Sequence, residues 1–326
     1  MDIEIKNRIN KLVNTDNNAA LMIGCRTTEY FHECCEYNVL LVGEKDEARI
    51  INDEQLGFIQ IEYIEREEFL RISNKEVSNL INSEIIQDNY FTLSTKIEDI
   101  KEHKSQIIKH YINSTDIELT TNMQKANNAI NKFSLNDAAY WTSLSTYNLI
   151  KLSIVQDKII PNPSHLLNQL KERKVEHNID QYYSLLDLEN ATKSSVERRL
   201  QALNNLYRLL STRIIGNQEL FLRRMKLIEN KIRWFIENKM ITNAFVLLGY
   251  ENLLVIEKIY TEYCNDKQVS KHNYRIISEI TEDNTSSGIG KSSIKMLSIT
   301  MDQQKIIDKI DIINNLLSEI RDNMTI

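Results

Sequence analysis

The sequence predicts an α+β protein that is predominantly α, in which a small mixed β-sheet is followed by a helical bundle. Only 7 glycines and 2 prolines occur in 326 residues, which leaves few breaks and favours long helices. Short apolar runs with alternating polar residues lie between residues 20 and 64, whereas helical spacing of apolar residues dominates after residue 98. We therefore expect a sheet domain at 1–97 and a helical domain at 98–326.

The first expected element is a helix over residues 3–13, before an Asn-rich break. Its apolar side should be formed by Ile3, Ile9, Leu12 and Val13. Strands are expected at about 20–25, 37–43, 48–52 and 57–64. The segment between the first two strands should hold a short helix. After Glu65 the spacing becomes helical, apart from a strand-like run at 90–95.

The second half of the chain reads as one helix after another. The basic residues of the run "RRMKLIENKIR", which begins at Arg223, alternate with apolar ones and are interpreted as the solvent-facing side of an amphipathic helix. A Ser- and Gly-containing linker is expected at 281–293. A C-terminal amphipathic helix at 300–322 should pack on this chain or on a second copy of it.

Polar residues interrupt two neighbouring strands near the N-terminus. An apolar run ends at Gly24, and the next begins with Glu36 and Asn38. Because alternate side chains of a strand share a face, Glu36 and Asn38 should point away from the core that receives their neighbours. The pattern predicts that a glycine turn and two polar side chains meet at one place.

This pattern resembles the signature of the DNA polymerase β-like nucleotidyltransferase superfamily. That signature is a Gly-Ser pair followed about ten residues later by Asp-hydrophobic-Asp-hydrophobic, and here Gly24-Cys25 precedes Glu36-Tyr37-Asn38-Val39. The resemblance implies that Gly24, Cys25 and Arg26 hold a nucleoside triphosphate. It also implies that Glu36 and Asn38, with a third residue, bind Mg²⁺ for phosphoryl transfer.

The third metal ligand and catalytic residue is expected on the strand "GFIQIEYI". Glu62 is the preferred residue, and Gln60, which shares its face, is the alternative. The signature is degenerate, because Asn38 removes a negative charge and Cys25 is a poorer hydrogen-bond donor than serine. We therefore expect a nucleotide-binding or regulatory protein whose catalysis is weakened or lost. The alternatives are an active Mg²⁺-dependent enzyme moving a nucleotide to an unknown hydroxyl, and a structural oligomerisation protein.

The segment Asp137 to Glu172 is similar to the helical substrate-binding or HEPN-type domains that accompany such enzymes. The Arg-x4-His pattern of ribonuclease-active HEPN domains is absent from this region, so RNA cleavage is not expected.

Charge and composition restrict the partners. The net charge of −6 and pI near 5.7 imply that nucleic acid would need a local basic patch. No apolar stretch reaches the roughly 20 residues of a membrane span, and the N-terminal segment is charged. We expect a cytoplasmic protein, without a membrane partner, whose cysteines are free and buried and whose helical domain forms a homo-oligomer such as a dimer.

Overall fold

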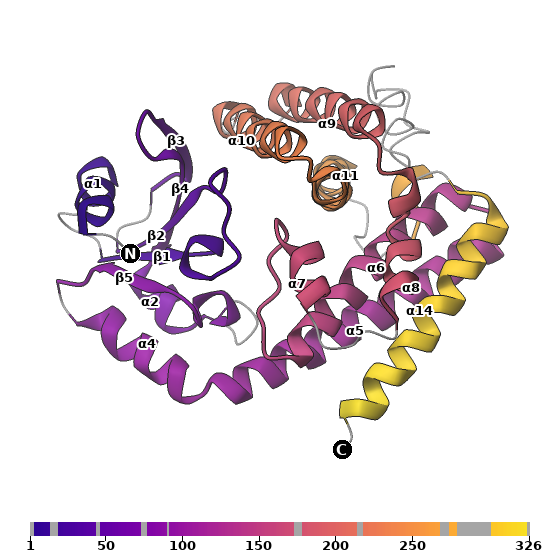
Figure 1. The fold of residues 1–326 in the computed structure, drawn as a ribbon, viewed down its shortest axis with the longest axis horizontal. Helices are drawn as coiled ribbons and strands as arrows, with labels where there is room; N and C mark the ends of the chain where they lie inside the picture. The colour runs from indigo at the N-terminus through magenta and orange to yellow at the C-terminus, as the bar shows by residue number, and fades with distance from the viewer. Residues whose placement is uncertain are drawn as a thin grey trace. The chain divides into compact units, whose positions relative to one another are not determined.

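The computed structural model describes residues 3–13, 19–43, 46–72, 77–89, 91–172, 178–213, 218–267, 274–278 and 301–324. A five-stranded mixed sheet is joined to many helices, which confirms the predicted fold class (Figure 1). The chain divides into two compact units. The sheet unit contains residues 1–114 and 226–231, and the helical unit contains 115–225 and 232–326. The linker predicted at 281–293 lies outside the described residues.

The sheet has the order β3-β4-β2-β1-β5. Its strands are β1 (Ala19–Ile23), β2 (Tyr37–Gly43), β3 (Arg49–Asp53), β4 (Gly57–Glu65) and β5 (Glu84–Gln87). Strands β2 and β4 are parallel, and the other three pairs are antiparallel. The four predicted strands are confirmed to within two residues at each end, because alternation of apolar and polar side chains gives a clear signal in a sheet with two different faces.

Helix α1 (Ile3–Val13) covers one face of this sheet and forms a hydrophobic core with it. The buried members of that core are Ile9, Val13, Ala20, Met22, Tyr37, Val39, Leu41, Ile59, Ile61 and Ile86. The predicted apolar side of the helix is wrong at Ile3, which is 75% exposed, and Ile5 packs against the core instead. Helical geometry explains the exchange, since Ile5 is one turn before Ile9 on the same side.

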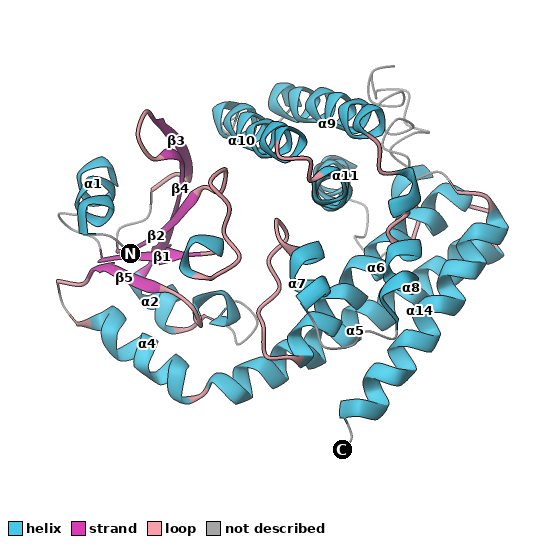
Figure 2. Ribbon diagram, viewed as in Figure 1, coloured by secondary structure: helices cyan, strands magenta, loops and turns pink. Residues whose placement is uncertain are grey.

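Two local predictions in the sheet unit are wrong (Figure 2). Between β1 and β2 the only helical element is the single 3-10 turn η1 (Cys25–Thr27), and residues 92–95 begin helix α4 (Thr92–Glu102) rather than a strand. The additional strand is β5, which pairs with β1 where helical spacing was read. Short apolar runs do not distinguish a strand from a buried helix by periodicity alone. The short helices α2 (Arg66–Leu70) and η2 (Ser78–Leu80) complete this unit.

Helices, most of them long, form the rest of the described chain. They are α5 (Lys104–Asn131), α6 (Leu135–Gln156), α7 (Leu166–Glu172), α8 (Ile179–Leu185), η4 (Leu188–Asn190), α9 (Lys193–Arg213), α10 (Gln218–Glu237), α11 (Ile241–Lys267) and α14 (Gln303–Met324). Helix α11 packs against α9, α7 and α6. Helix α5 begins in the sheet unit, and the middle of α10 belongs to that unit as well.

The predicted C-terminal helix is present as α14, which packs on α6 and α8 of the same chain. Its buried residues are Ile306, Lys309, Ile310, Ile313, Leu316, Leu317 and Ile320. The apolar stripe of α14 is therefore used within the chain. Homo-oligomer formation stays a prediction, and this stripe does not supply its interface.

Candidate functional site

The Gly24 turn lies directly against Asn38. Gly24 follows the last residue of β1 and has a φ of +81°, a conformation that glycine adopts without steric cost. A Cβ atom added at this position would lie 2.7 Å from Nδ2 of Asn38. Position 24 thus requires glycine for two reasons, its backbone conformation and the close approach of Asn38.

The strand register places Gln60, not Glu62, level with Asn38. Asn38 pairs with Ile23 on one side and with Gln60 on the other, whereas Glu62 pairs with Leu40. Glu62 therefore lies about 7 Å further along the strand, in the direction away from Glu36. Its exposed carboxylate accepts a hydrogen bond from Nε2 of Gln60 at 2.7 Å. Glu62 is not brought to Glu36, and the alternative residue Gln60 occupies the position beside Asn38.

Glu36 forms a buried ion pair within the sheet unit. Its carboxylate Oε2 lies 2.5 Å from Nζ of Lys231, and the two residues are only 6% and 4% exposed. Burial lowers the pKa of Lys231, whereas the charge of the Glu36 carboxylate and its hydrogen bond raise it, and the net shift is upward. Lys231 is therefore charged, and it neutralises Glu36.

Lys231 was missed because the basic run was assigned to solvent. That prediction is confirmed for Arg223, Lys226 and Arg233, which are exposed. It is wrong for Lys231 and for Arg224, whose Nη2 donates to the buried carboxylate of a residue on α11, Glu251, at 2.8 Å. The signal was the position of Lys231, three residues after Ile228 and four before Phe235, on the apolar side of α10.

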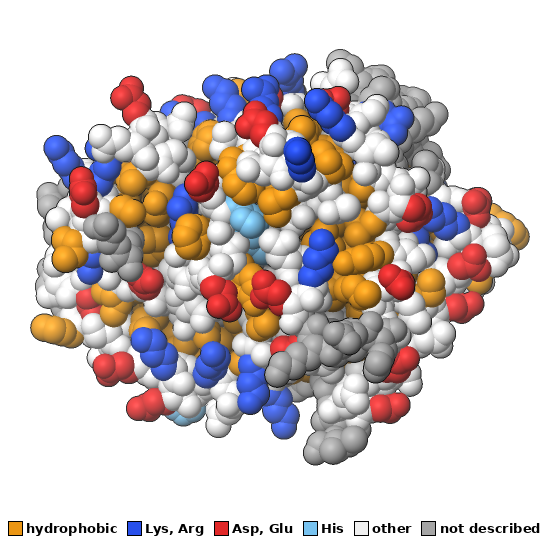
Figure 3. Space-filling model, in the orientation of Figure 1, with side chains coloured by type: hydrophobic (Ala, Val, Ile, Leu, Met, Phe, Trp, Pro, Cys, Tyr) orange, Lys and Arg blue, Asp and Glu red, His pale blue; other side chains and the backbone are white. Residues whose placement is uncertain are grey.

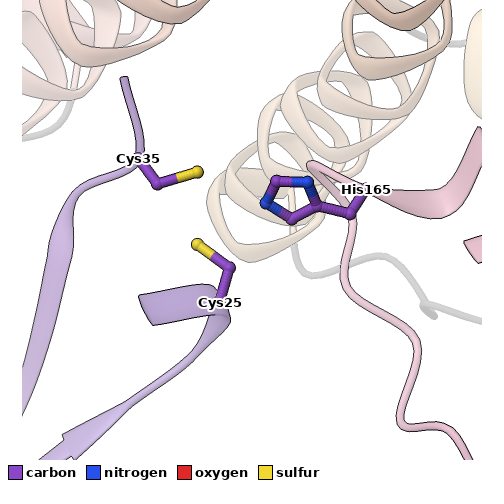
Figure 4. Close-up of side chains that lie close together, drawn as sticks. All are labelled: Cys25, Cys35 and His165. Carbon is purple, nitrogen blue, oxygen red and sulfur yellow. The ribbon is translucent and has the colours of Figure 1, made fainter. Parts of the chain in front are cut away.

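Three cysteines gather beside the Gly24 turn, and all three are free and buried, as expected. Figure 4 shows the thiols of Cys25 and Cys35 facing each other, with sulfur atoms within 4.8 Å. A hydrogen bond with Cys35, together with burial, raises the pKa of both Cys25 and Cys34. The Cys25 thiol thus stays neutral and points at another thiol, where the predicted serine-like contact with phosphate would need a free donor.

Arg26 stabilises the loop that leads into β2 by hydrogen bonds. Its Nε and Nη2 donate to the carbonyl oxygen of Cys35 at 3.0 and 2.7 Å, and Nη2 also donates to the carbonyl of Glu33. The guanidinium lies 4.3 Å from the centre of the Tyr37 ring. These contacts hold the loop in place, where a short helix was predicted. They also engage the Arg26 side chain that was expected to bind the triphosphate.

The charge arrangement differs from that of a magnesium site. A two-metal phosphoryl-transfer site needs several carboxylate oxygens with positions left open for water and substrate. Here the single carboxylate, Glu36, is paired with an ammonium group, and the neighbouring positions Asn38 and Gln60 carry neutral amides. The group as a whole has no net negative charge with which to attract a divalent cation.

Comparisons with known proteins leave the family open. No protein-family model and no curated protein matches the chain. The chain is similar to a solved nucleotidyltransferase-like protein from Exiguobacterium sibiricum 255-15, with 11% identity and a TM-score of 0.35, over 86% of this chain and 87% of that one. A similarity of this size assigns neither a family nor an activity. Among the described helices, none has the length and apolar character needed to span a membrane.

Proposed function

We propose that this chain is a nucleotidyltransferase-like protein without metal-dependent catalysis, which acts by binding a nucleotide or by regulation. The observation that carries this proposal is the buried ion pair between Glu36 and Lys231. Glu36 is the carboxylate that corresponds to the first metal ligand of the resembling signature. An ammonium group at that position supplies the positive charge that a metal ion would otherwise bring.

Binding of magnesium at Glu36 would require Lys231 to leave. Separating a buried ion pair costs about 3–5 kcal/mol when one charge stays buried without a partner. A site that must first break this pair, and that offers amides in place of a second carboxylate, binds magnesium poorly. A nucleotide at the Gly24 turn would then be held by backbone amides without a bridging metal ion.

Nucleotide binding with and without magnesium tests this proposal. Titration of the full chain with nucleoside triphosphates should give the same affinity in Mg²⁺ as in a chelator, and no transfer product should form. Replacement Glu36→Gln should leave any triphosphate affinity unchanged within about twofold. Glu62→Gln serves as the matched control, because it removes an exposed carboxylate from the same sheet.

Two results would overturn the proposal in different ways. A magnesium-dependent gain of about tenfold or more in triphosphate affinity that is lost in Glu36→Gln would establish the active enzyme instead. The absence of any nucleotide binding would leave the fold without a nucleotide ligand and would favour the structural alternative.

A further inference from the structure

Arg199 in the helical unit is buried without a direct ion-pair partner among the described residues. It lies on α9, is 9% exposed, and its guanidinium carbon lies 3.6 Å from the centre of the Phe245 ring. Within the described part of the chain the guanidinium makes no hydrogen bond and no ion pair, and its Nε is fully buried without a partner. Buried polar groups in native proteins are nearly always hydrogen-bonded, so this arginine calls for an explanation.

A small cavity lies beside Arg199. Its volume is about 50 Å³, and its charged and amide lining residues are Arg199, Lys309, Asp187 and Asn252. Asn252 is 1% exposed, and both polar atoms of its side-chain amide are buried without a partner among the described residues. Two different polar side chains, each more than nine-tenths buried, therefore face one cavity with unused hydrogen-bonding groups.

The charges around this cavity are unequal. Lys309 donates to Asp187 and to the carbonyl of Leu185, both at 2.7 Å, and Lys305 also pairs with Asp187. The Asp187 carboxylate thus forms ion pairs with two lysines, whereas it acts on Arg199 only through its charge, without a direct ion pair. The negative charge of Glu189, which is exposed, raises the pKa of the two lysines but has no such effect on Arg199. Burial lowers the pKa of both Arg199 and Lys309, as expected for cations that lack sufficient negative charge.

We propose that this cavity binds a small oxyanion of phosphate type, either the free ion or the phosphoryl group of an ester. Arg199 presents a planar fork of N–H donors that suits two oxygen atoms at once, and the Asn252 amide adds a further donor. The cavity exceeds the roughly 10–15 Å³ that one water needs. Water would satisfy Asn252 but would add no negative charge beside Arg199, Lys305 and Lys309, which share the single carboxylate of Asp187. An oxyanion would supply both the hydrogen-bond acceptors and the negative charge.

The site is independent of the proposed nucleotide function, because every residue that forms it belongs to the helical unit. The test is calorimetric titration of the full chain with sodium phosphate, with chloride at equal ionic strength as the reference. Saturable binding at one site is expected. Arg199→Met should weaken it about tenfold or more, which corresponds to the loss of a charge-assisted hydrogen bond.

Arg198→Met is the matched control, because Arg198 is the exposed neighbour on the same helix and carries the same charge. It should bind phosphate as the unaltered chain does. Absence of saturation in the unaltered chain, equal binding by Arg199→Met, or an equal loss in Arg198→Met would each overturn the proposal.

A second variant separates a loss of phosphate binding from a folding defect in Arg199→Met. Asn252→Leu removes both unpaired amide atoms at nearly constant volume, so it should fold at least as stably as the unaltered chain and bind phosphate several-fold more weakly. Unchanged binding in Asn252→Leu would remove this residue from the site and contradict the proposal.

Glycerol 3-phosphate distinguishes the two sources of the oxyanion. Binding of this ester that depends on Arg199 would identify a phosphoryl group on a larger ligand. Binding of inorganic phosphate alone would identify an enclosed free ion.

Discussion

Single residues decide the chemistry of the sheet unit. Asn38 and Gln60 lie side by side on adjacent strands as neutral amides, and the one remaining carboxylate, Glu36, is paired with Lys231. The turn requires glycine at position 24 because the approach of Asn38 leaves no room for a Cβ atom. The Gly24 turn and Asn38 thus meet as the resemblance implies, whereas the group carries no net negative charge.

The Glu36–Lys231 pair should show strong coupling in thermodynamic measurements. Lys231→Met leaves the buried Glu36 carboxylate without a partner and should lower the free energy of unfolding by about 3–5 kcal/mol. The double variant Glu36→Leu/Lys231→Met removes both charges and should recover most of this loss. Urea unfolding of the unaltered chain, of the single variants Glu36→Leu and Lys231→Met, and of the double variant measures the coupling. Additive losses would show that the two groups do not interact.

The pair of Arg8 and Asp53 should produce an acid dependence of stability. Arg8 donates to both carboxylate oxygens at 2.9 and 2.8 Å, and these bonds, with those from the amides of Leu56 and Gln55, lower the pKa of Asp53 to about 2 from its ordinary 3.8. A lowered pKa stabilises the fold above the unfolded-state value, and this contribution is lost as the pH falls from about 4 towards 2.

Asp53→Asn isolates that contribution, because its amide oxygen can still accept from the turn amides. The difference in unfolding free energy between the unaltered chain and Asp53→Asn should shrink as the pH is lowered from 5 to 2. Glu67→Gln is the control, since Glu67 and its partner Arg71 are both largely exposed. A difference that stays constant over this range would contradict the assignment.

At the scale of elements, helix contacts depend on a few close approaches. Helices α6 and α11 meet where Gly249 faces Tyr147, whose hydroxyl donates to the carbonyl of Val246 at 2.9 Å. The amphipathic pattern of α10 predicts its buried side, yet the buried Lys231 and the partly buried Arg224 each form an ion pair with a buried carboxylate. Helical periodicity locates an apolar side but does not reveal such partners.

Gly249→Ala should destabilise the helical unit, although alanine is normally the better helix former. The added Cβ atom would meet the hydroxyl oxygen of Tyr147 at 2.2 Å. Overpacking of this kind costs about 1–3 kcal/mol, or a fall of about 2–4 °C in Tm for each kcal/mol. Calorimetry of the same change in a Tyr147→Phe background should show a much smaller loss. An equal loss in both backgrounds would exclude this clash as the cause.

Helix α14 should contribute to stability through its buried side. Ile313 is fully buried, so Ile313→Ala should cost about 2–5 kcal/mol. Ile312→Ala makes the same chemical change at a half-buried neighbouring position and should cost clearly less. Thermal unfolding compares the two, and similar losses would mean that α14 does not pack on α6 through this face.

At the scale of the whole molecule, charge distinguishes the possible partners. The net charge is −6, and basic and acidic side chains are intermixed over the face drawn in Figure 3. The excess positive charge described above is local, around the cavity beside Arg199. We therefore expect a small anionic ligand rather than a nucleic acid as the partner.

Magnesium should not stabilise the protein. A ligand that binds only the native state raises the unfolding free energy, by about 2.7 kcal/mol at one hundred times its dissociation constant. Because Lys231 already neutralises Glu36, the Tm of the full chain should be the same in Mg²⁺ and in a chelator. A rise in Tm with magnesium that disappears in Glu36→Gln would contradict this expectation.

Much of the fold follows from local pattern. The strands β1 to β4, the core side of β2 and the C-terminal helix were predicted because alternation and helical periodicity report which side of an element is buried. Strand β5 and the start of α4 were missed because the apolar runs there are too short to carry a period. The candidate site was predicted in part, since Gly24 and Asn38 do meet, whereas Glu62 lies away from them.

The sequence by itself determined the fold class, most of the sheet and the pairing of the Gly24 turn with Asn38, because these depend on neighbours along the chain. Only the tertiary structure decided that Lys231 neutralises Glu36, that Arg26 hydrogen-bonds to the loop before β2, and that Arg199 is buried without a direct ion pair among the described residues. Each of these depends on which groups from distant segments share a buried space, and at low dielectric that proximity sets the energy of a charge.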